Sequence, residues 1–368
     1  MHSVFRRQRS ERSTAENEDQ KNTTQDERET ETMTMTMNTK LSLNETGVSA
    51  TVPRRADAIA IIQEEPDGLW IRFGGVSAAL YWAIHASCLV ALYTGVSAAD
   101  LTLLALTFWL RMFGITGGFH RYFSHRSYKT SRVMQFLLAI LGTSAIQKGP
   151  LWWAGAHRLH HRYSDQPGDP HSPRVSFWYA HQGWIFDPQW HETRIGEIRD
   201  FAKFPELVWL NQWHIVPPIA LGALCYGIGG LSGLVWGMAI STVACWHATY
   251  TINSLAHRWG STRFETGDDS RNNLFFALLT LGEGWHNNHH RFMNSTRQGF
   301  YWWEIDVSYY ILCGMKALGL IWDMKQPPAS VYAEATRMAE AAKMAGAAAG
   351  SEPNAVLASE VSETLAIR

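Results

Sequence analysis

Two long apolar hairpins limit what this chain of 368 residues can fold into more than any other feature. Their limbs run from Val76 to Ala98, Leu101 to Phe119, Ile215 to Ile228 and Leu231 to Ile252. The first turn lies at Asp100, and the second is the pair Gly229 and Gly230. Each limb is close to the ~20 residues that a helix needs to cross a bilayer, although the third is short and contains Pro217 and Pro218. The sequence therefore predicts an all-α integral membrane protein with four transmembrane helices in two hairpins.

The charges predict which side of the membrane the remaining segments occupy. The two hairpin turns contain no Lys or Arg, and the basic residues of the other side are Arg121, Arg126, Lys129, Arg158, Arg162, Arg258, Arg263 and Arg291. The positive-inside rule makes that side cytoplasmic, in a bacterial inner membrane or, in a eukaryote, in the endoplasmic reticulum. Both termini are expected there, and the run 133–146 is predicted to be an interfacial helix. A soluble protein with buried core helices is the alternative.

The two ends of the chain differ in composition from its middle. Residues 1–56 are rich in Ser, Thr, Glu and Asn and are predicted to be a disordered polar tail. The predicted domain covers residues 57–328, and residues 329–368 are an Ala-rich segment that is predicted to be partly helical and partly disordered. A net charge of −1 and a pI near 7.0 give no sign of a nucleic-acid partner.

Nine of the 16 histidines gather on the predicted cytoplasmic side, at or beyond the ends of the limbs. They are His120 and His125 in HRYFSH, His157, His160 and His161 in HRLHH, His257 in NSLAH, and His286, His289 and His290 in HNNHH. Two of these motifs repeat the offsets i, i+3 and i+4, which face the same way on a helix. The other seven histidines show no such spacing and are interpreted as ordinary polar or packing residues.

Converging neutral imidazoles form metal sites, and nine ligands are too many for one ion. A cytoplasmic helical cap that holds a histidine-ligated dimetal site is therefore predicted. Imidazole suits Zn, Cu, Fe and Ni, and the spacing does not choose among them. The soluble di-iron carboxylate pattern does not fit, because only Glu283 and His286 form a Glu-x-x-His pair, and Gly282 and Gly284 make that stretch a poor helix.

The histidine motifs resemble the boxes of the membrane fatty acyl desaturases of the stearoyl-CoA (acyl-CoA Δ9) desaturase family, bacterial type. The blocks GITGGFHRYFSHRSYKTS, SDQPGDPHSP, HQGWIF, GEGWHNNHHRF and ALGLIWDMK are also similar to that family. The resemblance covers about residues 70–325 and is highly specific in combination.

The resemblance implies two iron ions held by the nine histidines, with Asn253 reaching the second iron through water. Asn253 lies four residues before His257, which would place both on one helical face. In the family, reduced iron activates O2, and one hydrogen is removed from each of two adjacent methylenes of a long-chain acyl group. No haem-attachment or ferredoxin-like Cys motif is present, so a separate electron donor is implied, either ferredoxin or a b-type cytochrome with its reductase.

The family bends its acyl chain with a Gln, a Trp and a Thr, and the matching residues are Gln147, Trp153 and Thr249. Met112 and Phe108 match positions that help to close the end of the acyl tunnel, although both could simply face lipid. A bulky Met112 would favour palmitoyl over stearoyl groups.

Two features depart from the family's pattern. Gly155 and Ala156 stand where the animal enzymes carry an Arg-Asp pair that helps to hold coenzyme A, and Asp187 follows HQGWIF where basic residues are expected. The carrier therefore stays open among CoA, acyl carrier protein and membrane phospholipid. Arg111 lies about 13 Å before His120 along a helix and is a second departure without an evident partner.

Two other functions remain as alternatives. A related membrane di-iron hydroxylase would add oxygen to the acyl or lipid substrate in place of a double bond. A metal transporter would need ligands inside the spans, where only His85 and His247 lie.

Overall fold

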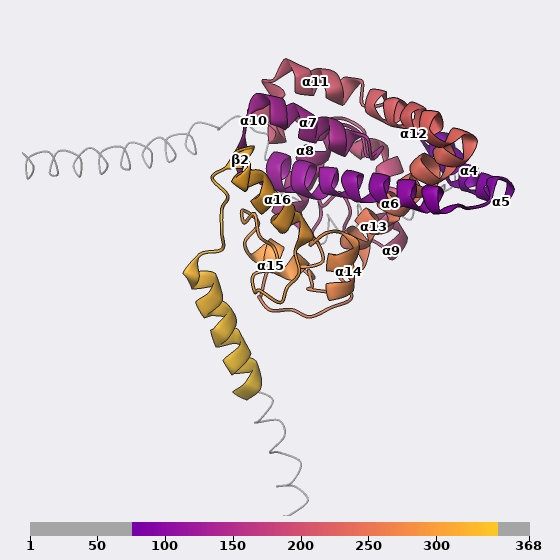
Figure 1. Ribbon diagram of the computed structural model, residues 1–368. Helices are drawn as coiled ribbons and strands as arrows, with labels where there is room; N and C mark the ends of the chain where they lie inside the picture. Colours follow the sequence, from indigo (N-terminus) through magenta and orange to yellow (C-terminus); the bar gives the residue numbers. More distant parts are fainter. Residues whose placement is uncertain (1–75, 345–368) are drawn as a thin grey trace, which may run out of the picture. The chain divides into compact units, whose positions relative to one another are not determined.

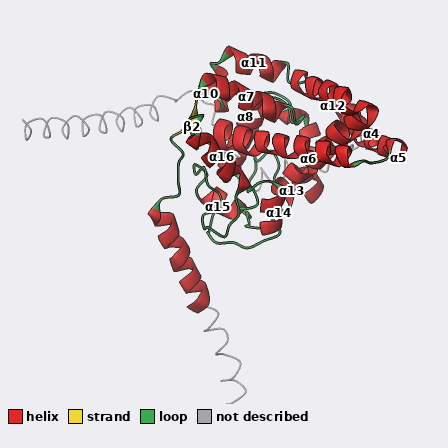
Figure 2. Ribbon diagram, in the orientation of Figure 1, coloured by secondary structure: helices red, strands yellow, loops and turns green. Residues whose placement is uncertain are grey.

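The computed structural model describes residues 76–344, most of which are helical (Figures 1 and 2). The polar segment 1–56 and the end of the Ala-rich segment lie outside the described residues, so their predictions stay untested. The Ala-rich segment forms a helix over 329–344, which packs through Val331 and Ala335 against Phe264 and Phe300.

The predicted limbs are helical. The first hairpin comprises α4 (Val76–Ser87), η1 (Cys88–Val90), α5 (Ala91–Thr94), α6 (Ala98–Phe113) and the π-helix η2 (Gly114–Ser124). The second comprises α12 (Val216–Leu234), the π-helix η6 (Val235–Ile240) and α13 (Ser241–Ser254). The segments 98–124 and 216–254 are long and apolar enough to cross a membrane, and 78–94 is a shorter apolar helix. The segment 216–254 is not one straight helix, because Gly230 has φ 59° and Gly229 is also non-helical, where the sequence predicts the turn.

Both hairpin turns lie at the same end of the helices. The Asp100 carboxylate accepts hydrogen bonds from the Ser97 backbone N–H (2.9 Å) and from the Ser232 hydroxyl (2.8 Å). Trp236 donates its indole N–H to the Gly95 carbonyl at 2.9 Å. Ser97 and Asp100 form a capping box that starts α6. The second and fourth limbs run away from these joined turns, and their far ends lead into the motifs HRYFSH and NSLAH.

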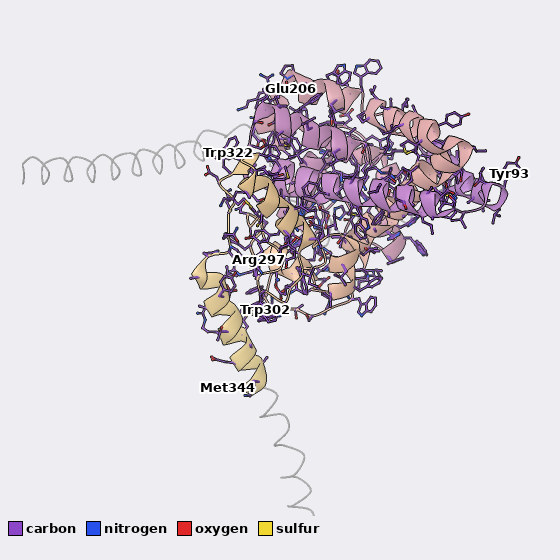
Figure 3. All side chains as sticks on the ribbon, in the orientation of Figure 1. Tyr93, Glu206, Arg297, Trp302, Trp322 and Met344 are labelled. Carbon is purple, nitrogen blue, oxygen red and sulfur yellow. The ribbon has the colours of Figure 1, made fainter. Side chains whose placement is uncertain are left out.

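Apolar side chains cover much of the outer surface of these helices. Tyr93, which is labelled in Figure 3, is 86% exposed. Leu92 is also 86% exposed, and Ile219 and Ile228 are exposed as well. So many exposed large apolar side chains would be a liability in water, whereas they match the hydrocarbon of a bilayer. The chain is therefore a membrane protein.

Arg111 has partners that the sequence does not reveal. It is buried in the first hairpin and reaches the second, where it donates hydrogen bonds to the hydroxyls of Thr242 (2.6 Å) and Ser241 (2.5 Å). Its Nε also donates to the Thr107 carbonyl at 3.1 Å. Neutral oxygens thus satisfy this guanidinium, which ties α6 to α13.

The remaining helices lie between and after the hairpins. The first set is α7 (Arg132–Thr143), α8 (Pro150–Tyr163), α9 (Phe177–His181), η3 (Gly183–Phe186), η4 (Pro188–Trp190), η5 (Ile195–Glu197), α10 (Arg199–Ala202) and α11 (Pro205–Gln212). The second set is α14 (Leu274–Leu279), α15 (His286–Arg291) and α16 (Val307–Ala317). One small antiparallel sheet pairs β1 (Lys129–Thr130) with β2 (Ile321–Trp322), with Lys129 opposite Trp322. The helix that the sequence predicts over 133–146 is α7. Its backbone lies so close to η2 that a Cβ added at Gly114 would be only 2.6 Å from the Gly142 nitrogen.

Candidate metal centre

The two histidine triplets lie on short helices that the sequence predicts. His157, His160 and His161 occupy the last two turns of α8, which begins with Pro150 at its first position. His286 starts α15, and the preceding stretch around Glu283 is a turn, as Gly282 with φ 124° requires. His120 is carried by η2, whose wide π-helical turns are frequent at functional sites.

Five imidazoles form a first group around one point. The group consists of His120, His125, His157, His161 and His289. Neighbouring Nε2 atoms are 3.0 Å apart between His120 and His289 and 2.9 Å apart between His289 and His161. The His157 Nε2 lies 3.0 Å from that of His161 and 2.9 Å from that of His125. Ligands at right angles around an ion that is about 2.1 Å away would be about 3.0 Å apart. The spacing therefore fits imidazoles that surround a transition metal.

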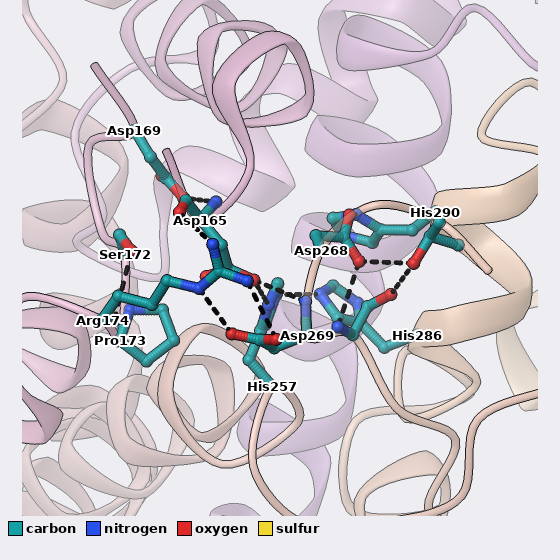
Figure 4. Close-up of polar contacts among 12 residues, drawn as sticks. Asp165, Asp169, Ser172, Pro173, Arg174, His257, Asp268, Asp269, His286 and His290 are labelled. Carbon is teal, nitrogen blue, oxygen red and sulfur yellow. Dashed lines mark hydrogen bonds and ion pairs between the residues drawn. The ribbon is translucent and has the colours of Figure 1, made fainter. Parts of the chain in front are cut away.

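Four imidazoles form a second group beside the first. The group consists of His160, His257, His286 and His290. The His257 and His286 Nε2 atoms are 2.9 Å apart (Figure 4). The buried Nε2 atoms of His160 and His290 have no hydrogen-bond partner. Buried polar atoms are nearly always satisfied, so such orphans call for an ion or water. A metal bound to these four nitrogens would satisfy both orphans.

Carboxylates hold four of these rings from behind. The Nδ1 atoms of His257 and His290 lie 2.8 Å from Asp165 and 2.6 Å from Asp268 (Figure 4). His160 makes the same contact with Asp169 at 2.9 Å. In the first group, the His120 Nδ1 lies 2.5 Å from Glu283. A carboxylate that accepts the Nδ1–H fixes the ring and leaves the Nε2 lone pair free for a metal, which is the usual arrangement behind histidine ligands.

The protonation of several of the rings also suits metal binding. Burial, followed by the neighbouring imidazoles, holds the pKa values of His157, His161 and His289 well below the ordinary value for histidine. Burial lowers the pKa of His290 to about 4, even though Asp268 acts in the opposite direction. These imidazoles are therefore neutral near pH 7, and their lone pairs can bind a cation.

One further histidine, which its spacing marks only as an ordinary polar or packing residue, lies beside the second group. His171 is buried, its ring centroid is 4.2 Å from that of His160, and it forms a third cluster with His160 and Asp169. Burial and the neighbouring His160 lower the pKa of His171 to about 3. The block SDQPGDPHSP contains Asp165, Asp169 and His171, so this block could have revealed the second layer of the site.

A cavity lies against the histidine groups. Its walls include Met112, Trp153, Thr249, Asn253, His120 and His286. Gln147 is hydrogen-bonded to the two other residues that match the family's chain-bending positions. Its side-chain amide donates to Thr249 and accepts from the Trp153 indole, both at 3.1 Å. The structure thus brings Gln147, Trp153 and Thr249 together. Phe108 is buried but is not among the residues that line this cavity.

Asn253 reaches the cavity by a different geometry from the one that its spacing suggests. Helix α13 ends at Ser254, so Asn253 and His257 are not on one face of a continuous helix. Asn253 lies on the last turn of α13, and His257 lies in the irregular segment beyond it. Both nevertheless border the same region, since Asn253 and His286 line the cavity and His286 contacts His257.

The chain resembles known proteins along most of the part that builds this site. A profile described as fatty acid desaturase matches residues 98–309. The chain is a fatty acid desaturase of this family. The match contains the nine histidines, the four carboxylates behind them and the cavity residues, so this desaturase carries its candidate metal centre within the family region.

Individual relatives of the desaturase differ in the substrates that their names state. The acyl-CoA C20 Delta5-desaturase of Anemone leveillei is 36% identical over 78% of this chain and 95% of its own length. The Delta-9 acyl-lipid desaturase 1 of Arabidopsis thaliana is 37% identical over 71% and 86%. A hex-5-enoyl-[acyl-carrier protein] acetylenase of Moorena producens is 37% identical over 68% and 82%.

Proposed function

We propose that this desaturase introduces a cis Δ9 double bond into saturated long-chain acyl groups with two iron ions, one at each histidine group. The observation that carries the proposal is the pair of groups of five and four imidazoles, with two buried Nε2 atoms that have no partner. The proposed ligands are His120, His125, His157, His161 and His289 for one iron, and His160, His257, His286 and His290 for the other, with Asn253 reaching the second through water. Iron held there would supply O2 chemistry that acid–base side chains cannot perform on unactivated C–H bonds.

The residues around the cavity support a role in positioning the acyl chain. Gln147, Trp153 and Thr249 form a hydrogen-bonded trio, and two of its members, Trp153 and Thr249, line the cavity where a bend in the chain would be held. Met112 is 1% exposed and lines the same cavity, which is consistent with closing its end. These contacts hold the reacting carbons at one depth relative to the metal groups, and this depth sets the position of the double bond.

The proposed carrier is CoA, acyl carrier protein or a membrane lipid. The named relatives include an acyl-CoA, an acyl-lipid and an acyl carrier protein enzyme, which supports this range. The position of the double bond is proposed as Δ9 because of the relative that acts at that carbon, although another relative acts at Δ5.

The proposed topology has four spans, with the histidine groups and both termini in the cytoplasm. The joined hairpin turns and the exposed apolar surface support it. A separate ferredoxin or b-type cytochrome with its reductase would deliver electrons on the cytoplasmic side. An activity reporter fused after Arg368 should therefore work inside the cytoplasm, and a reporter that works only outside would contradict this topology.

The function is tested by expressing the full chain in a desaturase-deficient host and analysing its fatty acids. We expect cis-9 unsaturated products that are two mass units lighter than the saturated precursors. The matched control is His160→Ala, which should insert into the membrane and give no such product. Products sixteen mass units heavier would indicate a hydroxylase. Metal uptake into liposomes without any acyl product would indicate a transporter.

A further inference from the structure

Away from the two metal groups, three more histidines form one hydrogen-bonded row. His85 lies on α4, His247 on α13 and His181 on α9. The His85 and His247 Nε2 atoms are 3.1 Å apart, and the His247 Nδ1 lies 2.9 Å from the His181 Nε2. Because His247 uses both of its nitrogens, the rings stand in line and do not converge as ligands of one ion would. We call His85, His247 and His181 the histidine row.

Both ends of the histidine row meet oxygen atoms. The His85 Nδ1 lies 2.9 Å from the Tyr81 carbonyl, which can only accept a hydrogen bond. The His181 Nδ1 lies 3.0 Å from the Ser254 hydroxyl oxygen, which also lies 2.8 Å from the Tyr250 carbonyl. The hydroxyl can turn, so it either donates to His181 or accepts from His181 while it donates to Tyr250.

Counting protons shows what this arrangement permits. Three neutral rings carry three ring protons, whereas the row has four contacts to fill when both end oxygens accept. The neutral row therefore has two proton orders. In one order the His85 Nδ1–H donates to Tyr81 and Ser254 donates to His181. In the other order the His85 Nδ1 is bare and His181 donates to Ser254. A proton that enters at the bare nitrogen and leaves at Ser254 converts the second order into the first.

The surroundings of the row are neutral. Tyr81 on α4 and Tyr250 on α13 are the titratable side chains that face the row. Gln182, the residue after His181, accepts a hydrogen bond from the Tyr81 hydroxyl at 2.8 Å. Within residues 76–344, no carboxylate forms an ion pair with any of the three rings. Burial and the neighbouring His247 lower the pKa of His181 to about 4. A proton near pH 7 would therefore pass through His181 and would not stay on it.

The two ends of the row have different access to water. His85 is half-buried, and its ring centroid lies 5.3 Å from that of Trp82, which is 48% exposed. His85 lies within the first limb but only one turn beyond Tyr81, whose hydroxyl meets Gln182 of the segment after α9, outside the spans. This places His85 close to the membrane interface, which tryptophan prefers and where water can supply protons. Ser254, at the other end, is fully buried and follows Asn253, which lines the cavity beside the metal groups.

We propose that the histidine row carries protons from the membrane interface to the wall of the active site. The proposal rests on the proposed function, whose balance is R–CH2–CH2–R′ + O2 + 2 e− + 2 H+ → R–CH=CH–R′ + 2 H2O. Two C–H bonds and the O–O bond break. A second bond forms between the two carbons, and four O–H bonds form with the two hydrogens of the acyl chain and the two added protons. The acyl chain is oxidised by two electrons, and the separate donor supplies the other two. Two protons must reach a buried site in each turnover, and the row is a path for them.

The first test is chemical rescue of the full-length protein in membranes. His247→Ala removes the middle ring but no proposed metal ligand. We expect an unchanged metal content, desaturation slowed at least about tenfold, and recovery on adding imidazole. The matched control, His191→Ala, removes an exposed histidine outside the row and should match wild type with and without imidazole. Wild-type rates in His247→Ala, or a slow variant with full metal content that imidazole does not restore, would overturn the proposal.

The second test needs neither metal nor activity. In the metal-free protein with 15N-labelled histidine, His85 should show both ring tautomers in wild type and only the Nδ1–H form in His247→Ala. A single fixed tautomer of His85 in wild type would contradict the relay. If His247→Ala does not accumulate, His85→Ala takes the same rescue test. A wild-type chain without any acyl product would defeat the proposed function itself, whereas an active wild type with an indifferent row would defeat only the relay.

Discussion

His160 and His161 are consecutive residues of α8, yet His161 belongs to the first histidine group and His160 to the second. Their ring centroids lie 5.4 Å apart and their planes are inclined at 67°. His289 and His290 on α15 are divided in the same way, with centroids 5.6 Å apart. Each helix thus gives an i, i+4 pair to one group and the remaining ring to the other. The two groups are therefore held together by two short helices.

This division predicts that neighbouring substitutions remove different ions. His160→Ala should empty the second group and His161→Ala should weaken the first, so each variant should hold about one iron per chain, against about two in wild type. Desaturation should fall more than about 100-fold in both, since even changes behind metal ligands cost 10–100-fold. Metal analysis and product assays on membrane-inserted protein check this, with His191→Ala as the control. Full activity in His160→Ala would refute the ligand assignment.

The carboxylates behind the rings predict a graded effect on metal affinity. Asp268→Asn leaves the His290 ring in place but weakens the contact that orients it at 2.6 Å. We expect metal affinity to fall by about 10–100-fold. Competition with a chelator measures this. Asp269→Asn is the matched control, because Asp269 pairs with Arg174 at the surface. Equal affinities in the two variants would show that Asp268 does not support the site.

Met112 predicts the preferred chain length. If Met112 closes the cavity, the last carbons of a longer acyl chain cannot be buried there. Each CH2 left unburied costs about 0.8 kcal/mol of binding free energy, which is a roughly fourfold preference for the shorter chain. The enzyme should therefore favour palmitoyl over stearoyl groups, and Met112→Ala should relax this preference. Phe108→Ala, at a buried residue outside the cavity lining, is the comparison. An unchanged ratio of sixteen- to eighteen-carbon products in Met112→Ala would place the end of the tunnel elsewhere.

The buried imidazoles predict how the metal-free protein responds to acid. Burial and neighbouring rings hold the pKa values of His157 and His286 well below normal, and burial lowers that of His290 to about 4. The unfolded chain binds these protons near pH 6.5, so it holds more protons than the folded chain below that pH. The free energy of unfolding should therefore fall as the pH drops from about 7 towards 4.

Denaturant unfolding in detergent at pH 7.5 and pH 5 measures this slope. His286→Ala should make the slope shallower, because it removes one of the groups that titrates differently in the two states. A stability that rises on acidification would contradict the buried, neutral state of these rings.

Sequence patterns predict the parts of this site that depend on local spacing. The offsets of His157, His160 and His161 predict one helix, and the glycines beside Glu283 predict that the stretch before His286 is a poor helix. The spacing does not divide the rings between two groups, because this depends on how α8 and α15 face each other. The same offset logic failed for Asn253, because α13 ends at Ser254 before the expected turn is complete.

Other relationships have no local signal at all. His85 and His247 are 162 positions apart, and His181 lies between them on a third helix, so no motif joins them. Arg111 on α6 likewise donates hydrogen bonds to Ser241 and Thr242 on α13, which are far away in the sequence. Such partners follow only from the tertiary packing of the hairpins.

The central claim is that both histidine groups must hold iron for a double bond to form. It is tested most directly by stripping the purified chain of metal, adding ferrous iron stepwise without oxygen, and then assaying each sample with an electron donor, O2 and a saturated acyl substrate. The account predicts that activity approaches its maximum at about two irons per chain, with a product two mass units lighter than the substrate. Full activity at one iron per chain, or a product sixteen mass units heavier, would contradict it.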